Sequence, residues 1–224
     1  WPAEHFAKLA GLICAKSKMT VVLTGGRQDQ GLARQMMASA LNCRPVDLTG
    51  RTSLGELAVI FSRASFVVSG DSGPMHIASG TGTRVAALFG PTDPELTGPR
   101  GTGEKIILSF VPKGYKSPWY GGPGRNLPAE GWLSQITPEQ VLNALEEKGW
   151  FQKNSKHADV PLFSRPKRNE KKGHILIVTL SNIGDVILTT PVITFLARQY
   201  PKSSVTIVCG PKAAPLLENS HWVD

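Results

Sequence analysis

Long hydrophobic runs are absent from this 224-residue chain. A helix needs about 20 consecutive apolar residues to span a bilayer, whereas the apolar runs here are short, as at residues 175–178. This excludes a membrane-spanning class of protein and predicts buried strands instead. A signal peptide and an initiator Met are also missing, since the chain begins at Trp1. We therefore expect a piece of a longer protein.

Cysteine is scarce as well, and the three residues, Cys14, Cys43 and Cys209, are far apart in the sequence. Each lies in an apolar context, which predicts buried, reduced thiols and a reducing compartment. Their spacing from histidines matches no metal site, so we expect no bound metal.

The charge is uneven along the chain. Residues 151–173 supply five of the eight net positive charges. A basic stretch of low hydrophobicity is typical of a solvated linker. The alternative is a segment that contacts anionic membrane lipids. Nucleic acid is not expected as a partner, because aromatic residues do not alternate with the charges to form a stacking platform.

Apolar segments of strand length alternate with segments of helical periodicity, a pattern that predicts an α/β fold with Rossmann-like parallel sheets. We expect one domain over residues 1–150, a basic linker over 151–173, and the start of a second Rossmann-like domain over 174–224. Capping boxes at Ser53 and Thr137 predict two helix starts.

A polar turn follows a short apolar strand within residues 65–76 (SFVVSGDSGPMH). Backbone N–H groups at the start of the next helix can hold an anion, and Gly73 allows close approach of the backbone while the Ser72 hydroxyl adds a donor. His76 lies one turn into that helix and can face the same ligand. The alternative is structural, with Asp71 acting only as the N-cap.

A second polar turn, which includes Ser181 and Gly184, ends at Asp185. It follows a first strand, where open α/β sheets place their sites, so Asp185 could act as a general base toward an acceptor hydroxyl. Its structural alternative is again an N-cap. The turn has one glycine and is a poor dinucleotide fingerprint, and the chain has no P-loop motif.

The two turns together resemble glycosyltransferase family 9, the heptosyltransferases of the lipopolysaccharide inner core. Residues 66–78 and 88–94 resemble the nucleotide-sugar signature of its C-terminal domain. Residues 175–186, with 189–191, resemble the start of its N-terminal domain. The order of the two domains is reversed here, and the middle of the family's chain is missing. The simplest account is the end of one transferase joined to the beginning of another.

This resemblance implies a GT-B fold, here incomplete, and an inverting, metal-independent transfer of a heptose-like sugar from an ADP-sugar to a lipopolysaccharide-core-type acceptor. It implies no cofactor apart from the donor substrate, and it makes Asp185 the base. Asp29, after a Gly-Gly pair, loosely matches an acidic residue near the donor ribose. The substrate-binding residues that it implies are Asp71, Ser72, Gly73, His76, Gly184 and Ser181.

The implied partners are a nucleotide-sugar donor and a lipid-linked saccharide acceptor. We therefore expect a cytoplasmic protein, with peripheral contact at the inner face of the membrane through residues 151–173. Two alternatives stay open: a non-catalytic fragment that binds a nucleoside diphosphate, and a nucleotide-sugar epimerase of related fold. An epimerase would need further acid–base residues, which the sequence does not identify.

Overall fold

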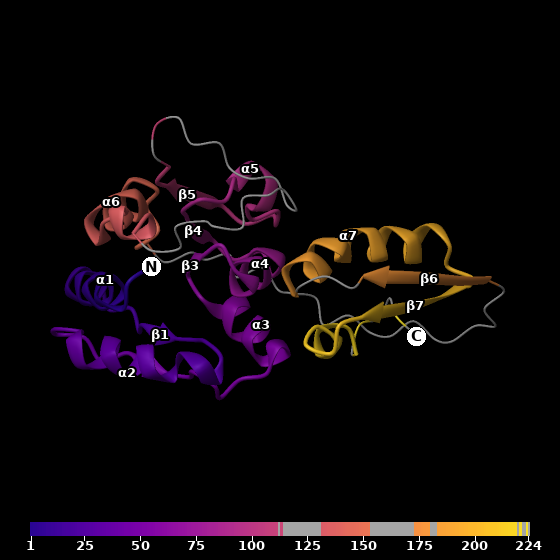
Figure 1. The fold of residues 1–224 in the computed structure, drawn as a ribbon, viewed down its shortest axis with the longest axis horizontal. Helices are drawn as coiled ribbons and strands as arrows, with labels where there is room; N and C mark the ends of the chain where they lie inside the picture. Colours follow the sequence, from indigo (N-terminus) through magenta and orange to yellow (C-terminus); the bar gives the residue numbers. More distant parts are fainter. Residues whose placement is uncertain are drawn as a thin grey trace.

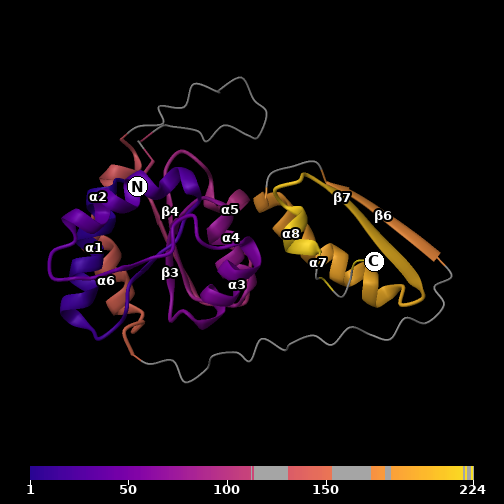
Figure 2. The ribbon, with the colours of Figure 1, turned by 90° about the horizontal axis from the view of Figure 1, so that it is seen from below.

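The computed structural model describes residues 1–111, 113, 131–152, 173–179, 183–218, 220 and 223. Within them the predicted α/β class with parallel sheets is confirmed (Figures 1 and 2). Most of the predicted basic linker and Ser181 lie outside the described residues. No helix in the described part of the chain is long and apolar enough to cross a bilayer.

A three-stranded parallel sheet forms the centre of the first unit, in the order β3-β4-β5. β3 (Val67–Gly70) pairs with β4 (Val85–Phe89), which pairs in turn with β5 (Lys105–Ser109). Helix α4 (Gly73–Gly80) connects the first two strands, and the short helix α5 (Pro94–Thr97) precedes β5. Because the strands are parallel, the turn after β3 and the loop after β4 emerge at the same edge of the sheet.

The apolar residues 85–89 form strand β4, which lies in the middle of the sheet. All five of its residues are buried, because helices cover both faces of the sheet. Ala86 and Leu88 face a core that includes α1 (Ala3–Lys16) and α6 (Pro138–Glu147). The alternate residues of β4 face the second core, beside α3 (Leu54–Arg63) and α4. Figure 2 shows these two helix layers on either side of the sheet.

The beginning of the chain adds a smaller parallel pair, β1 (Val22–Leu23) with β2 (Val46–Asp47). The 3-10 turn η1 (Arg27–Asp29) and helix α2 (Gln30–Ser39) connect them. A second 3-10 turn, η2 (Leu133–Gln135), leads into α6.

Both predicted capping boxes form. At the start of α3 the Ser53 amide donates to Glu56 Oε2 at 2.8 Å, and the Glu56 amide donates back to Ser53 Oγ at 3.3 Å. The backbone and hydroxyl hydrogen bonds from Ser53 hold the pKa of Glu56 below its usual range. Thr137 and Gln140 form the same reciprocal pair at the start of α6.

The last part of the chain is a β-α-β unit. β6 (Gly173–Thr179) pairs in parallel with β7 (Ser203–Cys209), and α7 (Ile183–Gln199) connects them before the short α8 (Ala214–Leu217). One face of this pair packs on α7 through a cluster centred on Val186, Ile193 and Val205. The opposite face exposes Leu176 and Val178.

The expectation of three buried, reduced thiols is wrong. Cys14 in α1 and Cys43 after α2 form a disulfide, with Cα atoms 5.7 Å apart, and all three cysteines are only half-buried. Packing of α1 against α2 around Ala7, Ala10 and Met36 brings the two cysteines together across 29 residues of sequence. Sequence spacing alone cannot reveal such a pairing.

Thiol titration of the denatured, unreduced protein should therefore find one free thiol per chain, that of Cys209. Reduction should raise the count to three and lower the free energy of unfolding by about 2–4 kcal/mol, because the open loop regains entropy in the unfolded chain. The double variant Cys14→Ser/Cys43→Ser is the control, since reduction should no longer change its stability. Three titratable thiols before reduction would contradict the pairing.

Candidate functional site

The first polar turn lies between β3 and α4, at the carboxyl edge of the three-stranded sheet. Ser72, not Asp71, is the N-cap of α4, and its side chain makes no capping hydrogen bond. Its hydroxyl instead donates to the carbonyl oxygen of Gly70 at 3.2 Å and lies 3.2 Å from Ser69 Oγ. The structural alternative for Asp71, a helix N-cap, is therefore wrong.

The carboxylate of Asp71 lies toward α5. Its Oδ2 accepts a hydrogen bond of 3.1 Å from the hydroxyl of Thr97. Sequence reasoning missed Thr97, because this contact joins residues 26 positions apart on separate elements. No short-range motif could have pointed to it.

The start of α4 has the properties of an anion site. Its first residue is Gly73, whose N–H has no acceptor within the helix, and Pro74 follows it without an N–H group. The first turn of α4, described in full, has no acidic side chain to offset the positive end of the helix dipole. An anionic group placed there would meet a free amide and a favourable field.

His76 and Gly184 come together from the two units of the chain. The imidazole is buried, with 7% of the residue exposed. A Cβ on Gly184 would lie 3.0 Å from Cδ2 of His76 and 3.5 Å from Nε2. The lack of a Cβ at Gly184 lets α7 lie this close to the histidine, so one residue from each of the two predicted turns is in contact with the other.

The same contact continues along both helices. A Cβ on Gly73 would lie 3.5 Å from Cγ2 of Ile183, and one on Gly80 would lie 3.9 Å from Cγ2 of Ile187. The contacts advance in the same direction along α4 and α7, so the two helix N-termini lie side by side (Figures 1 and 2). Two positive dipole ends therefore meet at one place.

Asp185 is the third residue of α7. Helix α7 already begins at Ile183, so Asp185 is not the residue that precedes the helix, as its N-cap alternative required. Its backbone lies next to Gly184 at the α4 contact. Of the predicted site residues, Ser181 lies outside the described residues, and of Asp185 only the place of its backbone in α7 is described.

Asp29 serves a local turn. Its Oδ2 accepts hydrogen bonds from the Gly26 amide at 2.8 Å and from Gln28 Nε2 at 3.2 Å, which closes η1 after β1. This explains the residue type without a ligand.

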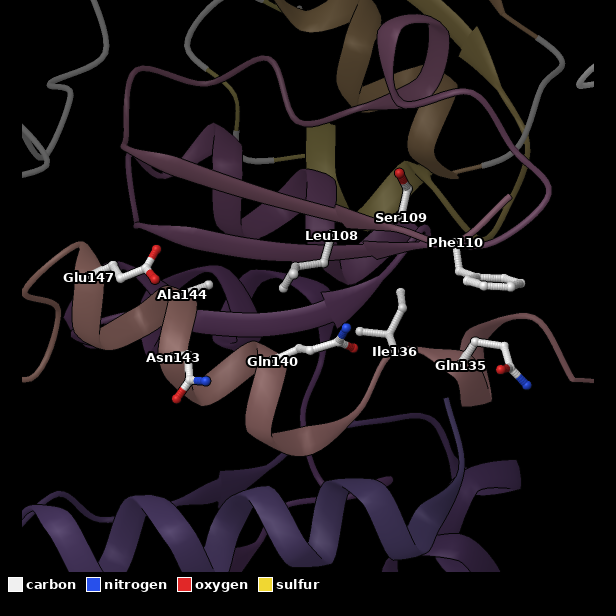
Figure 3. A pocket seen from close by; sticks show the side chains of 9 residues that line it. All are labelled: Leu108, Ser109, Phe110, Gln135, Ile136, Gln140, Asn143, Ala144 and Glu147. Carbon is white, nitrogen blue, oxygen red and sulfur yellow. The ribbon is translucent and has the colours of Figure 1, made fainter. Parts of the chain in front are cut away.

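A cleft of about 340 Å³ lies elsewhere, between β5 and α6 (Figure 3). Its walls combine apolar side chains, such as Leu108 and Ile136, with the amides of Gln135, Gln140 and Asn143. None of the predicted site residues lines it, so it is separate from the α4–α7 contact.

Comparison with known proteins identifies the family. The model of glycosyltransferase family 9 (heptosyltransferase) matches residues 1–116, more than half of the chain. The chain belongs to this family. It is 35% identical over 156 residues to lipooligosaccharide heptosyltransferase 2 of Haemophilus influenzae, a match that covers 66% of this chain and 42% of that protein.

Solved structures agree. The glycosyl transferase family 9 protein from Veillonella parvula superposes with a TM-score of 0.57 at 30% identity, over 66% of this chain and 41% of that one. E. coli heptosyltransferase WaaC with ADP gives a TM-score of 0.50 at 25% identity, over 66% and 39%. The predicted GT-B type is thus confirmed by its neighbours. The chain spans about two fifths of the length of the relatives that it matches.

Proposed function

We propose that this protein is a glycosyltransferase that moves a heptose-like sugar from an ADP-sugar to a lipopolysaccharide-core-type acceptor, with inversion and without a metal. In this proposal the donor diphosphate binds at the start of α4 and Asp185 is the general base. Family membership and the heptosyltransferase relatives support the reaction class. The structure of E. coli heptosyltransferase WaaC, solved with ADP, supports the nucleotide.

The observation that carries the proposal is the meeting of the α4 and α7 N-termini through Gly184 and His76. A diphosphate leaving group gains negative charge as its bond to the sugar breaks. Preorganised amides and dipoles aimed at that position stabilise the charge without reorganisation at the moment of reaction. The Gly73 amide, which no acceptor within the helix engages, is such a donor.

General-base catalysis completes the proposal. The acceptor hydroxyl must lose its proton as it attacks the sugar carbon from the face opposite the leaving group. Asp185 is in the first turn of α7, and α7 is the helix that contacts α4. In this proposal the base and the donor diphosphate therefore lie on neighbouring helices of the same chain, although the order of the two domains is reversed.

Two further parts of the proposal concern location. We propose a cytoplasmic protein whose basic stretch at residues 151–173 contacts anionic lipids at the inner face of the membrane. The excess of Lys and Arg in that stretch supports this, because anionic lipid surfaces attract polybasic segments.

A second candidate is a module that binds a nucleoside diphosphate without catalysis. The observation in its favour is that an anion needs only the start of α4, whereas transfer also needs a base on α7. The two candidates share the diphosphate site and differ in whether transfer occurs.

Calorimetry with ADP tests the shared site. We expect the wild-type chain to bind ADP and Gly73→Asp to weaken binding at least about tenfold, because the new carboxylate would face the diphosphate within a few ångströms. A Cβ at Gly73 would make an ordinary contact with Ile183 Cγ2 at 3.5 Å, and an acidic residue suits a helix start.

Gly73→Asn is the matched control, with the same shape and no charge. It should keep most of the affinity, and UDP should bind more weakly than ADP if the base is recognised. Equal ADP affinities for Gly73→Asp and Gly73→Asn would exclude a diphosphate at this helix start. A wild-type chain that does not bind ADP would remove both candidate functions.

A further inference from the structure

Asp71 is held from outside its own turn. Thr97 Oγ1 lies 3.1 Å from Asp71 Oδ2 and 3.2 Å from the carbonyl oxygen of Asp93, so one hydroxyl is shared between α5 and the turn before α4. Within the described part of the chain, Thr97 is the only hydrogen-bond donor to the Asp71 side chain.

Helix α5 is itself well anchored at this position. Asp93 caps it by accepting from the Glu95 amide at 2.9 Å, and Pro94 occupies the first turn. The Thr97 amide donates to the Asp93 carbonyl at 3.0 Å. Thr97 is therefore placed by the backbone of α5, and its half-buried side chain reaches Asp71 from there.

A carboxylate beside a diphosphate site has a particular chemical meaning. An ionised carboxylate only accepts hydrogen bonds and repels phosphate, so Asp71 suits the hydroxyl groups of a sugar and not the diphosphate. Thr97 occupies one acceptor site of Oδ2, and the remaining sites of the carboxylate can accept from such a hydroxyl.

We infer that Thr97 is a positioning residue that orients the Asp71 carboxylate toward the sugar portion of the donor. This rests on the proposed function, which puts the donor diphosphate at the start of α4. Loss of the Thr97 hydroxyl would free the carboxylate to rotate, and the contact with the sugar would weaken while the contact with the diphosphate would not.

Binding of two probes, ADP and ADP-heptose, tests the inference on the 224-residue chain. Thr97→Val keeps the side-chain shape and removes the hydroxyl. We expect it to weaken ADP-heptose binding about tenfold, in line with the loss of one hydrogen bond to a charged group, and to leave ADP binding within about twofold. Thr97→Ser should restore ADP-heptose binding, a rescue that a purely structural role would not produce.

Thr194→Val is the matched control, since Thr194 also donates to a carbonyl, that of Thr190 at 3.0 Å, within α7. It should change neither affinity. If Thr97→Val weakens the binding of ADP and ADP-heptose equally, or changes neither affinity, the role of Thr97 is overturned and the proposed function is not. Failure of the wild-type chain to bind ADP would overturn the proposed function and this inference with it. If Thr97→Val does not fold, Thr97→Ala takes its place, and equal weakening of ADP and ADP-heptose by Thr97→Ala, or no change in either, would overturn the role of Thr97.

Discussion

Replacing Trp150 by alanine should lower the free energy of unfolding by about 3–5 kcal/mol, the usual cost of deleting a fully buried large side chain. Trp150 is 0% exposed and belongs to the core shared by α1, α6 and the sheet. Its ring centroid lies 5.9 Å from that of Phe66, and the Arg84 guanidinium lies over the ring at 5.8 Å.

Polar contacts add to this cost. The indole N–H of Trp150 donates to Glu104 Oε2 at 3.1 Å, and the same oxygen accepts from Arg84 Nε at 3.0 Å. Trp150 also caps the carboxyl end of α6. Its amide donates to the Leu145 carbonyl at 3.0 Å, just after Gly149, which has a φ of +65°. This is the Schellman arrangement, and it directs the indole back into the core.

Urea unfolding measures the effect. Trp150→Phe should lose less stability, since it keeps an aromatic ring in the site, and Leu41→Ala, at a residue that is 79% exposed, should stay within about 0.5 kcal/mol of wild type. A Trp150→Ala variant as stable as Leu41→Ala would show that this core is not packed as described.

Asp185→Asn should lower the rate of sugar transfer by about 10²–10⁴-fold in the full-length protein, the range for loss of a general base. The affinity for ADP should stay within about twofold, because the proposed diphosphate site is the start of α4. ADP release in the presence of acceptor measures the first quantity, and calorimetry measures the second.

A purely structural role within α7 makes a different prediction. If Asp185 only interacted with the dipole at the start of α7, its loss would lower the free energy of unfolding by about 0.3–1 kcal/mol without affecting transfer. Glu139→Gln is a suitable control, since Glu139 lies in the first turn of α6 and pairs with Lys8 at 2.6 Å. Normal transfer by Asp185→Asn would remove Asp185 as the base.

Local patterns predicted much of the fold. The Ser53–Glu56 capping box is read correctly from sequence because its hydrogen bonds join residues three positions apart. The alternation of apolar strand-length segments with helical segments predicted parallel sheets, because parallel strands are joined by helices, and β3, β4 and β5 confirm it. The family resemblance also came from sequence, since its motifs lie in the turns that follow the strands.

The N-cap alternatives show what a local sequence pattern leaves undecided. An acidic residue in a strand–helix turn can cap the helix or leave that role to its neighbour, and the sequence is the same in both cases. The choice depends on which partner is within reach: Asp71 has Thr97 beside it, so Ser72 becomes the N-cap.

By itself, then, the sequence determined the elements, the parallel α/β class, the family and the two polar turns, because the interactions that encode them act within one turn or one strand. Only the tertiary structure decided that Cys14 bonds to Cys43, that Thr97 holds Asp71, and that Gly184 lies against His76. Each of these contacts joins separate elements. It exists because whole helices pack together where their apolar faces match and where a glycine allows close approach.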